Sequence, residues 1–303
     1  MVGLGGALVA LGLVFALRHR RRPPVVALAA VLIALPISQR SSEPCQLETA
    51  YYCVTVEPDP ERPTGRTLLL DNLRHSYVDL ADPTYLQFRY LRLFAAVVDA
   101  HASGPRRALH IGGGGFTFPR WLAATRPGSD STVLELDKDV LAVARNELGL
   151  RTGARLSVRT GDARLNIRDG RDNAHDLVVG DAFGGLSVPW HLTTVEMVRE
   201  IERVLRDDGI YVLNVIDAGP RDLVRAVMAT LREVFDHTLL LAPAGRVSGN
   251  HVLVASNAPI TTPDIGTGEA VAVTGAQLDR FVANAIVLRD DFAPASQLIT
   301  RDD

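Results

Sequence analysis

The stretch ALHIGGGGFTFPRWLAATRPGSDSTVLELD, residues 108–137, decides the fold of this chain. Residues 108–111 are apolar and predict a short buried strand, and four glycines follow directly. The spacing of apolar residues then predicts a helix over 118–125 and a second strand over 132–136. A strand, a glycine turn, a helix and a strand in this order are typical of one unit of a parallel β-sheet.

The same alternation continues toward the C-terminus. We predict helices at 139–148, 194–205 and 221–234, and strands at 156–159, 177–179, 210–215, 238–242 and 251–256. Strands that alternate with helices form a mainly parallel sheet covered by helices on both faces. The sequence therefore predicts an α/β domain over residues 81–303.

A small β-region is predicted to precede this domain, over residues 45–80. Residues 51–56 and 66–70 are strand-like, and the segment between them, 57–65, contains three prolines and a glycine that predict a turn. Helical spacing of apolar residues begins at 86 and continues to 100.

Composition and charge restrict the class of protein. The chain has 303 residues, of which 47% are hydrophobic and 22% charged, with a net charge of −3. This composition excludes disordered and fibrous classes for the bulk of the chain. It also argues against a nucleic-acid partner, because such proteins carry an excess of basic residues. Two cysteines are too few for a cysteine-rich zinc site.

The first 40 residues are predicted to be a membrane segment. Two apolar runs, 1–17 and 23–37, flank a stretch with four arginines at 18–22. Either both runs cross the membrane as a helical hairpin, or the basic stretch and the second run form a signal peptide or signal anchor. A buried core helix is the third option. Arginines near a span stay on the cytoplasmic side, so both membrane interpretations place the following domain outside the cytoplasm.

The two cysteines lie just after this segment. Cys45 and Cys53 are close enough in sequence to form a disulfide, which persists in an oxidising compartment. Alternatively, they are two unpaired small apolar side chains. We expect a protein of the cell membrane, with the side occupied by the domain left open.

Four features fall at the carboxyl ends of the predicted strands, where open α/β sheets bind their ligands. The first is the run Gly112, Gly113, Gly114 and Gly115. Glycines allow a tight turn and a close approach of a ligand to the backbone. The alternative is a simple strand-to-helix turn. The run lacks the third glycine of the dinucleotide pattern.

The other three features are acidic. Glu135 ends the second strand, where a carboxylate can accept hydrogen bonds from both hydroxyls of a ribose. Asp162, beside Ala163, follows the third strand and can accept from an exocyclic amine or cap a helix. Asp181 follows the fourth strand and is a candidate general base, or else a surface acid. Their order predicts a nucleoside site.

Residues 70–216 resemble the spermidine synthases, which are polyamine aminopropyltransferases. They resemble most the branch in which hydrophobic helices precede the domain. The resemblance rests on the motifs LDNLRHS (70–76), HIGGGG (110–115), VLELD (133–137), GDA (161–163), VGDAF (179–183) and LNV (213–215), with DDFAP (290–294) near the end. It implies a Rossmann-like S-adenosylmethionine-dependent methyltransferase fold.

The resemblance also implies an activity and roles for residues. A transferase of this family moves an aminopropyl group from decarboxylated S-adenosylmethionine, its co-substrate, to a polyamine, without a metal. Asp181 would be the catalytic base that takes a proton from the attacking amine. The donor would be bound by Gly112, Gly113, Gly114, Glu135, Asp162, Ala163 and His75. The assembly state is left open, with a homodimer as one option.

The sequence departs from the family pattern at several positions, including His75 in place of the usual Gln and Tyr85-Leu86-Gln87 in place of Tyr-His-Glu. Gly115 and Phe116 replace the last two residues of Gly-Gly-Gly-Asp-Gly, whose Asp would hold the ammonium of the donor. Gly184 replaces a second acid three residues after Asp181. Two other functions therefore stay open: an S-adenosylmethionine-dependent enzyme with another acceptor, and a catalytically silent, membrane-tethered binding domain. An exported domain would meet little nucleoside donor, which favours the silent domain.

Overall fold

The computed structural model describes residues 45–266 and 268–299. The predicted membrane segment, residues 1–40, lies outside the described residues. Among the helices that are described, none is both long enough and apolar enough to cross a membrane. Both Cys45 and Cys53 are disulfide-bonded.

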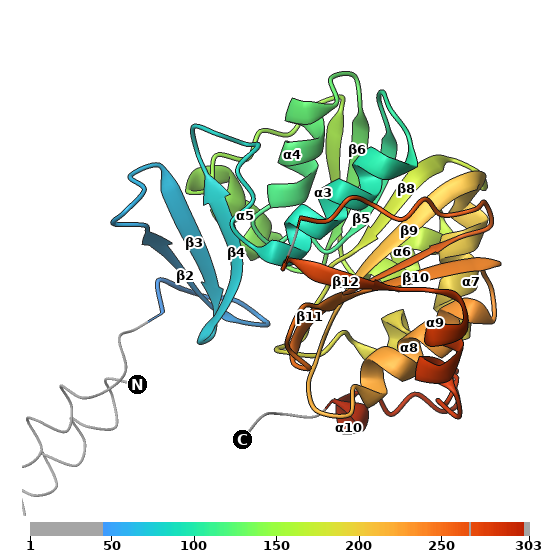
Figure 1. The fold of residues 1–303 in the computed structure, drawn as a ribbon. Helices are drawn as coiled ribbons and strands as arrows, with labels where there is room; N and C mark the ends of the chain where they lie inside the picture. The colour runs from blue at the N-terminus through green and yellow to red at the C-terminus, as the bar shows by residue number, and fades with distance from the viewer. Residues whose placement is uncertain (1–44, 267, 300–303) are drawn as a thin grey trace, which may run out of the picture. The chain divides into compact units, whose positions relative to one another are not determined.

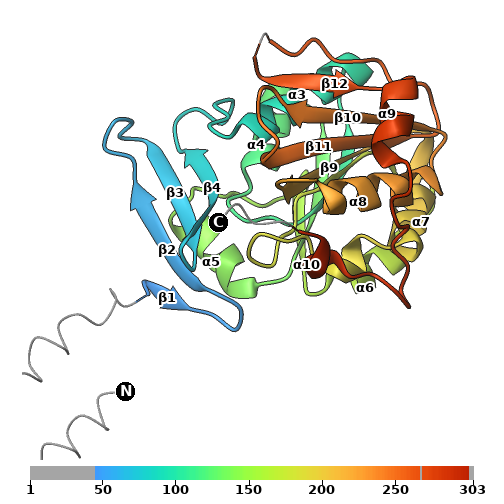
Figure 2. The same cartoon turned by 60° about the horizontal axis from the view of Figure 1, so that its bottom comes forward.

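Two β-sheets organise residues 46–299. The first is an antiparallel sheet of four strands in sequence order: β1 (Leu47–Glu48), β2 (Cys53–Pro58), β3 (Gly65–Leu70) and β4 (Leu73–Asp79). Figure 1 labels β2, β3 and β4 of this sheet, in blue to teal, and Figure 2 also labels β1. The turn between β3 and β4 contains Asp71 at a positive φ of 56°, a conformation that Asp tolerates better than most residues.

The second sheet has eight strands in the order β12-β10-β11-β9-β8-β5-β6-β7. Its parallel strands are β5 (Arg107–Ile111), β6 (Asp130–Glu135), β7 (Leu156–Thr160), β8 (His175–Gly180) and β9 (Leu205–Asp217). The antiparallel strands are β10 (His237–Pro243), β11 (Gly249–Ser256) and β12 (Ala270–Val273). The predicted alternation of strands and helices is confirmed.

Helices cover both faces of this sheet (Figures 1 and 2). The longer ones are α3 (Arg89–His101), α4 (Thr117–Thr125), α5 (Lys138–Asn146), α7 (Val195–Val204), α8 (Asp222–Arg232) and α9 (Gly275–Val282). The short ones are α6 (Ala163–Arg168), α10 (Ala295–Leu298) and the 3-10 turn Trp190–Leu192.

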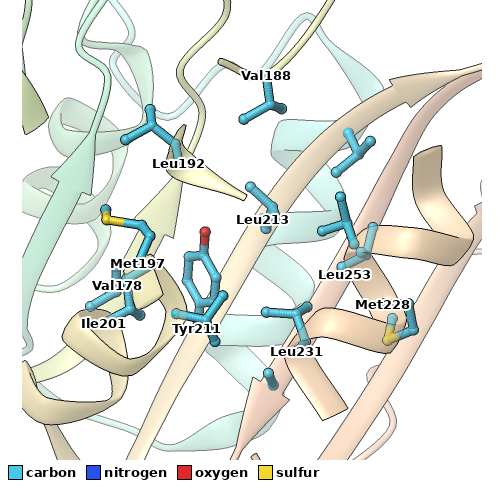
Figure 3. Close-up of a cluster of buried hydrophobic side chains, with 14 of the residues drawn as sticks. Val178, Val188, Leu192, Met197, Ile201, Tyr211, Leu213, Met228, Leu231 and Leu253 are labelled. Carbon is cyan, nitrogen blue, oxygen red and sulfur yellow. The ribbon is translucent and has the colours of Figure 1, made fainter. Parts of the chain in front are cut away.

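Alternation along β9 shows how the sheet divides its side chains. Ile210 and Val212 pack on the face covered by α3 and α4. Tyr211 and Leu213 pack on the opposite face against α7 and α8. Figure 3 shows this second cluster, in which Met197 and Ile201 of α7 and Leu231 of α8 surround Tyr211. Both faces of the strand are therefore buried, as expected for the centre of such a sheet.

A third cluster joins the small sheet to the main domain. Leu68 and Val78 from the small sheet pack with Leu141 and Ala144 of α5. Phe116, at the end of the glycine turn, is fully buried in the same cluster. The small sheet is thereby held close to the glycine turn.

Strand order reverses next to β5. The chain runs from β5 through β6 to β7 on one side, whereas β8 and β9 lie on the other side. At such a reversal, the loops after the two neighbouring strands diverge and leave a crevice at their carboxyl ends. The crevice here lies between the glycine turn after β5 and Asp181 after β8.

Candidate functional site

A cavity of about 430 Å³ lies at this crevice. The main sheet contributes the glycines 112–114 and the three acids Glu135, Asp162 and Asp181 to its wall. The small sheet contributes Tyr52, Arg74, His75 and Ser76. The predicted base and all residues predicted to bind the donor, Ala163 included, therefore line one cavity, whereas Gly115 of the glycine run does not.

Gly112 is required by the geometry of the turn. Its φ is +96°, and a Cβ at this position would lie 2.4 Å from the carbonyl oxygen of Asp181. No side chain larger than hydrogen fits there without moving β8. The close approach fixes the backbone of Asp181 against the glycine turn.

Glu135 is buried and its carboxylate is firmly held. Its side chain accepts hydrogen bonds from the backbone N–H groups of Gly113 (2.8 Å), Gly114 (3.1 Å) and Asp137 (2.9 Å). Burial raises the pKa of Glu135, and these three hydrogen bonds act in the opposite direction. The alternative role, a charge at the start of the next helix, is filled by Asp137, which caps α5 through the N–H of Asp139 at 2.8 Å.

Asp162 caps a helix and faces the cavity at once. Its Oδ1 accepts from the N–H groups of Arg164 (2.7 Å) and Leu165 (3.2 Å), so the capping interpretation is realised. Its Oδ2 lies 3.5 Å from Nε2 of His191, which also lines the cavity. One oxygen therefore anchors α6 and the other is directed at the site.

Asp181 is the centre of a polar chain. Its Oδ2 accepts a hydrogen bond from the hydroxyl of Tyr90 (2.8 Å), and its Oδ1 accepts from Nδ2 of Asn214 (3.0 Å). Asn250 in turn donates to Oδ1 of Asn214 (3.1 Å). Burial raises the pKa of Asp181 to about 6, although the two hydrogen bonds lower it. Burial and the neighbouring Asp181 raise the pKa of Tyr90 well above its usual value, so its hydroxyl stays a donor.

His75 contributes a partly buried ring to the cavity wall. Burial lowers its pKa, which favours the neutral imidazole. The ring lies 6.1 Å from that of Tyr52, whose hydroxyl donates to the carbonyl oxygen of Phe183 at 3.0 Å. The small sheet thereby holds the loop that follows Asp181.

The structure explains the departures at Gly115 and Phe116. Gly115 is buried outside the cavity wall and donates its N–H to Oγ of Ser76 (2.9 Å). A Cβ at Gly115 would lie 2.7 Å from Cβ of Ser76, so Ser76 occupies the direction of an acidic side chain. Phe116 adopts a left-handed φ of 57°, which costs about 1–2 kcal/mol, and its complete burial offsets that cost. Gly184 is in open space.

No family model matches the chain. A polyamine aminopropyltransferase of Vibrio vulnificus is 32% identical over 152 residues, 50% of this chain and 50% of that protein. A polyamine aminopropyltransferase of Moorella thermoacetica is 30% identical over 207 residues, 66% of this chain and 70% of that protein. This chain belongs to the polyamine aminopropyltransferase family. The predicted spermidine synthase-like relationship is confirmed.

Solved structures agree with this membership. A probable spermidine synthase from Corynebacterium glutamicum superposes with a TM-score of 0.75 and 26% identity, covering 80% of this chain and 95% of that one. Human methyltransferase-like protein 13, solved with SAH, matches with a TM-score of 0.51 and 20% identity, which shows the fold alone. The Rossmann-like methyltransferase fold predicted from the sequence is confirmed.

The sequence did not predict roles for Tyr90, Asn214 or Asn250 in this site. Tyr90 is the second residue of α3 and lies far from the acids in sequence. Asn214 carried a signal, because it is a buried polar residue inside the apolar run of β9. Buried amides need partners, and the partner here is Asp181.

Proposed function

We propose that this protein transfers an aminopropyl group from decarboxylated S-adenosylmethionine to an amine. Asp181 carries the proposal. Its carboxylate sits at the strand reversal, is held at both oxygens by Tyr90 and Asn214, and has a pKa of about 6. A base with this pKa is ionised at neutral pH and is closer in pKa to an amine than an ordinary carboxylate is.

Asp181 would prepare the attacking amine. A primary amine has a pKa near ~10 and is cationic at neutral pH, so its lone pair is blocked until a proton leaves. The carboxylate attracts the ammonium, orients it and accepts the proton. The lone pair then attacks the carbon attached to the sulfonium, the C–S bond breaks, and its electron pair stays on sulfur. The leaving group is neutral methylthioadenosine.

The nucleoside of the donor would lie on the other side of the glycine turn. Glu135 offers its remaining lone pairs to the ribose hydroxyls, because three backbone N–H groups already fix its orientation. Asp162 and Ala163 would face the adenine, and His75 would close the wall from the small sheet. Gly112, Gly113 and Gly114 let the sulfonium portion approach the backbone.

A second candidate is transfer of a methyl group from intact S-adenosylmethionine. The position expected to hold the aminopropyl ammonium of the donor is Gly115, which lies outside the cavity wall behind Ser76. A third is a binding domain without turnover. The three predict different ligand preferences.

Calorimetric titration of the full-length chain separates these functions. We expect micromolar binding of methylthioadenosine and tighter binding of decarboxylated than of intact S-adenosylmethionine. Preference for the intact donor would support methyl transfer. A folded protein that binds none of the three would contradict any nucleoside-dependent function.

We also propose that the protein belongs to the membrane-fused branch and that residues 1–40 anchor it in the cell membrane. The support is the pair of uncharged runs around the arginines and the disulfide bonding of both cysteines, which is typical of oxidising compartments. Alkaline phosphatase fused to the C-terminus tests the side: activity in intact cells would place the domain outside the cytoplasm, where it would meet little nucleoside donor, and would contradict the proposed transfer. An inactive fusion, with an active cytoplasmic reporter at the same site, would place the domain inside.

A further inference from the structure

The cavity has two halves that follow the order of the strands. Glu135 and Asp162 follow β6 and β7 on one side of the glycine turn. Asp181, Asn214 and Asn250 belong to β8, β9 and β11 on the other side. If the nucleoside occupies the first half, the acceptor amine extends from Asp181 along β9 and β11.

The acceptor half offers one carboxylate. Of the three acids in the described cavity wall, Glu135 and Asp162 lie in the nucleoside half, which leaves Asp181. The groups beyond it are the amides of Asn214 and Asn250 and the apolar side chain of Ile216. A second ammonium on the acceptor would therefore find no anionic partner among these wall residues.

An arginine lies at this end of the cavity. Arg89 precedes Tyr90, lines the cavity and is partly buried. Within residues 45–266 and 268–299, no hydrogen bond or ion pair engages its side chain. Its charge acts on His251, next to Asn250 in β11: burial is the main cause of the lowered pKa of His251, and Arg221 and Arg89 add to it. Helix α3, which begins at Arg89, packs against β11 and β9, so Arg89 lies on the β11 side of the cavity.

A second arginine strengthens the positive potential. The guanidinium of Arg74 lies 5.9 Å from the ring centre of Phe88, the neighbour of Arg89, and Arg74 also lines the cavity. Arg89 is partly buried and has no carboxylate partner among the described residues, so it is suited to bind an anion, because its fork of donors matches the two oxygens of a carboxylate. The same charge repels a second ammonium.

We propose that the acceptor is an amine that carries a carboxylate at its other end, and that Arg89 determines this specificity by binding the carboxylate. The inference rests on the proposed aminopropyl transfer. The amine end meets Asp181 and the carboxylate end meets Arg89. The new bond joins the amine nitrogen to the aminopropyl carbon, the C–S bond breaks, methylthioadenosine leaves, and one proton passes through Asp181 to solvent.

Two acceptors of matched length test the proposal. Putrescine and δ-aminovalerate share an amine and four methylenes, and they end in an ammonium and a carboxylate respectively. With the full-length chain and decarboxylated S-adenosylmethionine, we expect kcat/KM to be about 10- to 100-fold higher for δ-aminovalerate, the factor of one charged hydrogen-bonded pair. A higher value for putrescine would overturn the proposal.

Charge reversal supplies the second readout. Arg89→Glu should invert the preference between the two acceptors, and Arg89→Gln should abolish it. The matched control is Arg199→Glu, an exposed arginine of α7, which should keep the wild-type ratio. Unchanged affinity for methylthioadenosine shows that each variant is folded with its nucleoside half intact. A folded Arg89→Glu variant with the wild-type ratio overturns the proposal.

Failure of the proposed activity has a different signature. If neither amine releases methylthioadenosine from the wild-type protein, aminopropyl transfer itself is wrong and the acceptor assignment falls with it. If Arg89→Glu keeps the acceptor ratio and instead lowers the affinity for intact S-adenosylmethionine, Arg89 binds the carboxylate of a donor, which also overturns the proposal.

Discussion

The hydroxyl of Tyr90 donates a 2.8 Å hydrogen bond to Oδ2 of Asp181, although 91 positions separate the two residues. Tyr90 lies in the first turn of α3 and Asp181 directly after β8, so the bond joins a helix on one face of the sheet to the edge where ligands bind. Burial raises the pKa of Asp181, and this bond limits the rise. Tyr90 is therefore a positioning residue that sets the proton affinity of the proposed base.

The first prediction concerns pH. The rate should rise with pH through about 6, because Asp181 accepts a proton only when ionised and its pKa is about 6. Tyr90→Phe removes a donor to the carboxylate, so the rising limb should move to higher pH by up to about one unit. Profiles of kcat/KM from pH 5 to 9 measure this, with the exposed Tyr51→Phe as the control. If the rising part of the pH profile of Tyr90→Phe coincides with that of the wild type, the hydrogen bond from Tyr90 does not set the pKa of Asp181.

The second prediction is that Asp181→Asn stabilises the fold while it abolishes turnover. The native pKa of about 6 lies above the ordinary 3.8, so the native state disfavours the charge at neutral pH. Removing the charge should raise the free energy of unfolding by about 1–3 kcal/mol at pH 7. The gain should shrink as pH falls from 6 to 4, where the native and then the unfolded carboxyl become protonated. Urea unfolding at pH 7 and pH 4 tests this.

Its control is Asp291→Asn, at an exposed position near the C-terminus. That variant should change stability little at either pH. An Asp181→Asn protein less stable than wild type at pH 7 would show that the two hydrogen bonds outweigh the cost of burial.

The third prediction concerns the ribose. Glu135→Gln keeps the size of the side chain and removes its charge, so methylthioadenosine should bind about 10- to 100-fold more weakly. Calorimetry gives the affinity, and an unfolding curve checks that the glycine turn is intact. Glu57→Gln, at an exposed residue of β2, is the control. Wild-type affinity in folded Glu135→Gln would remove Glu135 from the ribose site.

The fourth prediction separates two effects at a glycine. Gly112 and Gly104 have φ values of +96° and +86°, but a Cβ at Gly104 meets nothing within 4 Å, unlike the 2.4 Å contact at Gly112. Gly104→Ala should cost about 1 kcal/mol, the price of the left-handed backbone alone. Gly112→Ala should cost at least about 2 kcal/mol more and reduce turnover, since β8 must move. Equal losses in urea unfolding would contradict the tight packing.

The sequence predicted the parallel core well, because the spacing of apolar residues that marks helices and strands is clear there. It missed β4, whose Arg74, His75 and Ser76 break the alternation that marks a strand, and α6, which has only six residues. It also predicted none of the elements after β11, which are β12, α9 and α10. At the site, the acids at strand ends were predicted because the carboxyl ends of parallel strands meet at one edge of the sheet. Tyr90 and Arg89 were not found, because their place depends on how α3 packs across the sheet. Gly115 also required the structure, which shows Ser76 beside it.

The most direct test of the account is to identify the nucleoside that the full-length protein releases. The protein is incubated with decarboxylated or intact S-adenosylmethionine and a set of amines, and the products are identified by mass spectrometry. The account predicts methylthioadenosine and an amine extended by one aminopropyl group, from the decarboxylated donor only and not with Asp181→Asn. Release of S-adenosylhomocysteine from the intact donor, or undiminished turnover in Asp181→Asn, would contradict it.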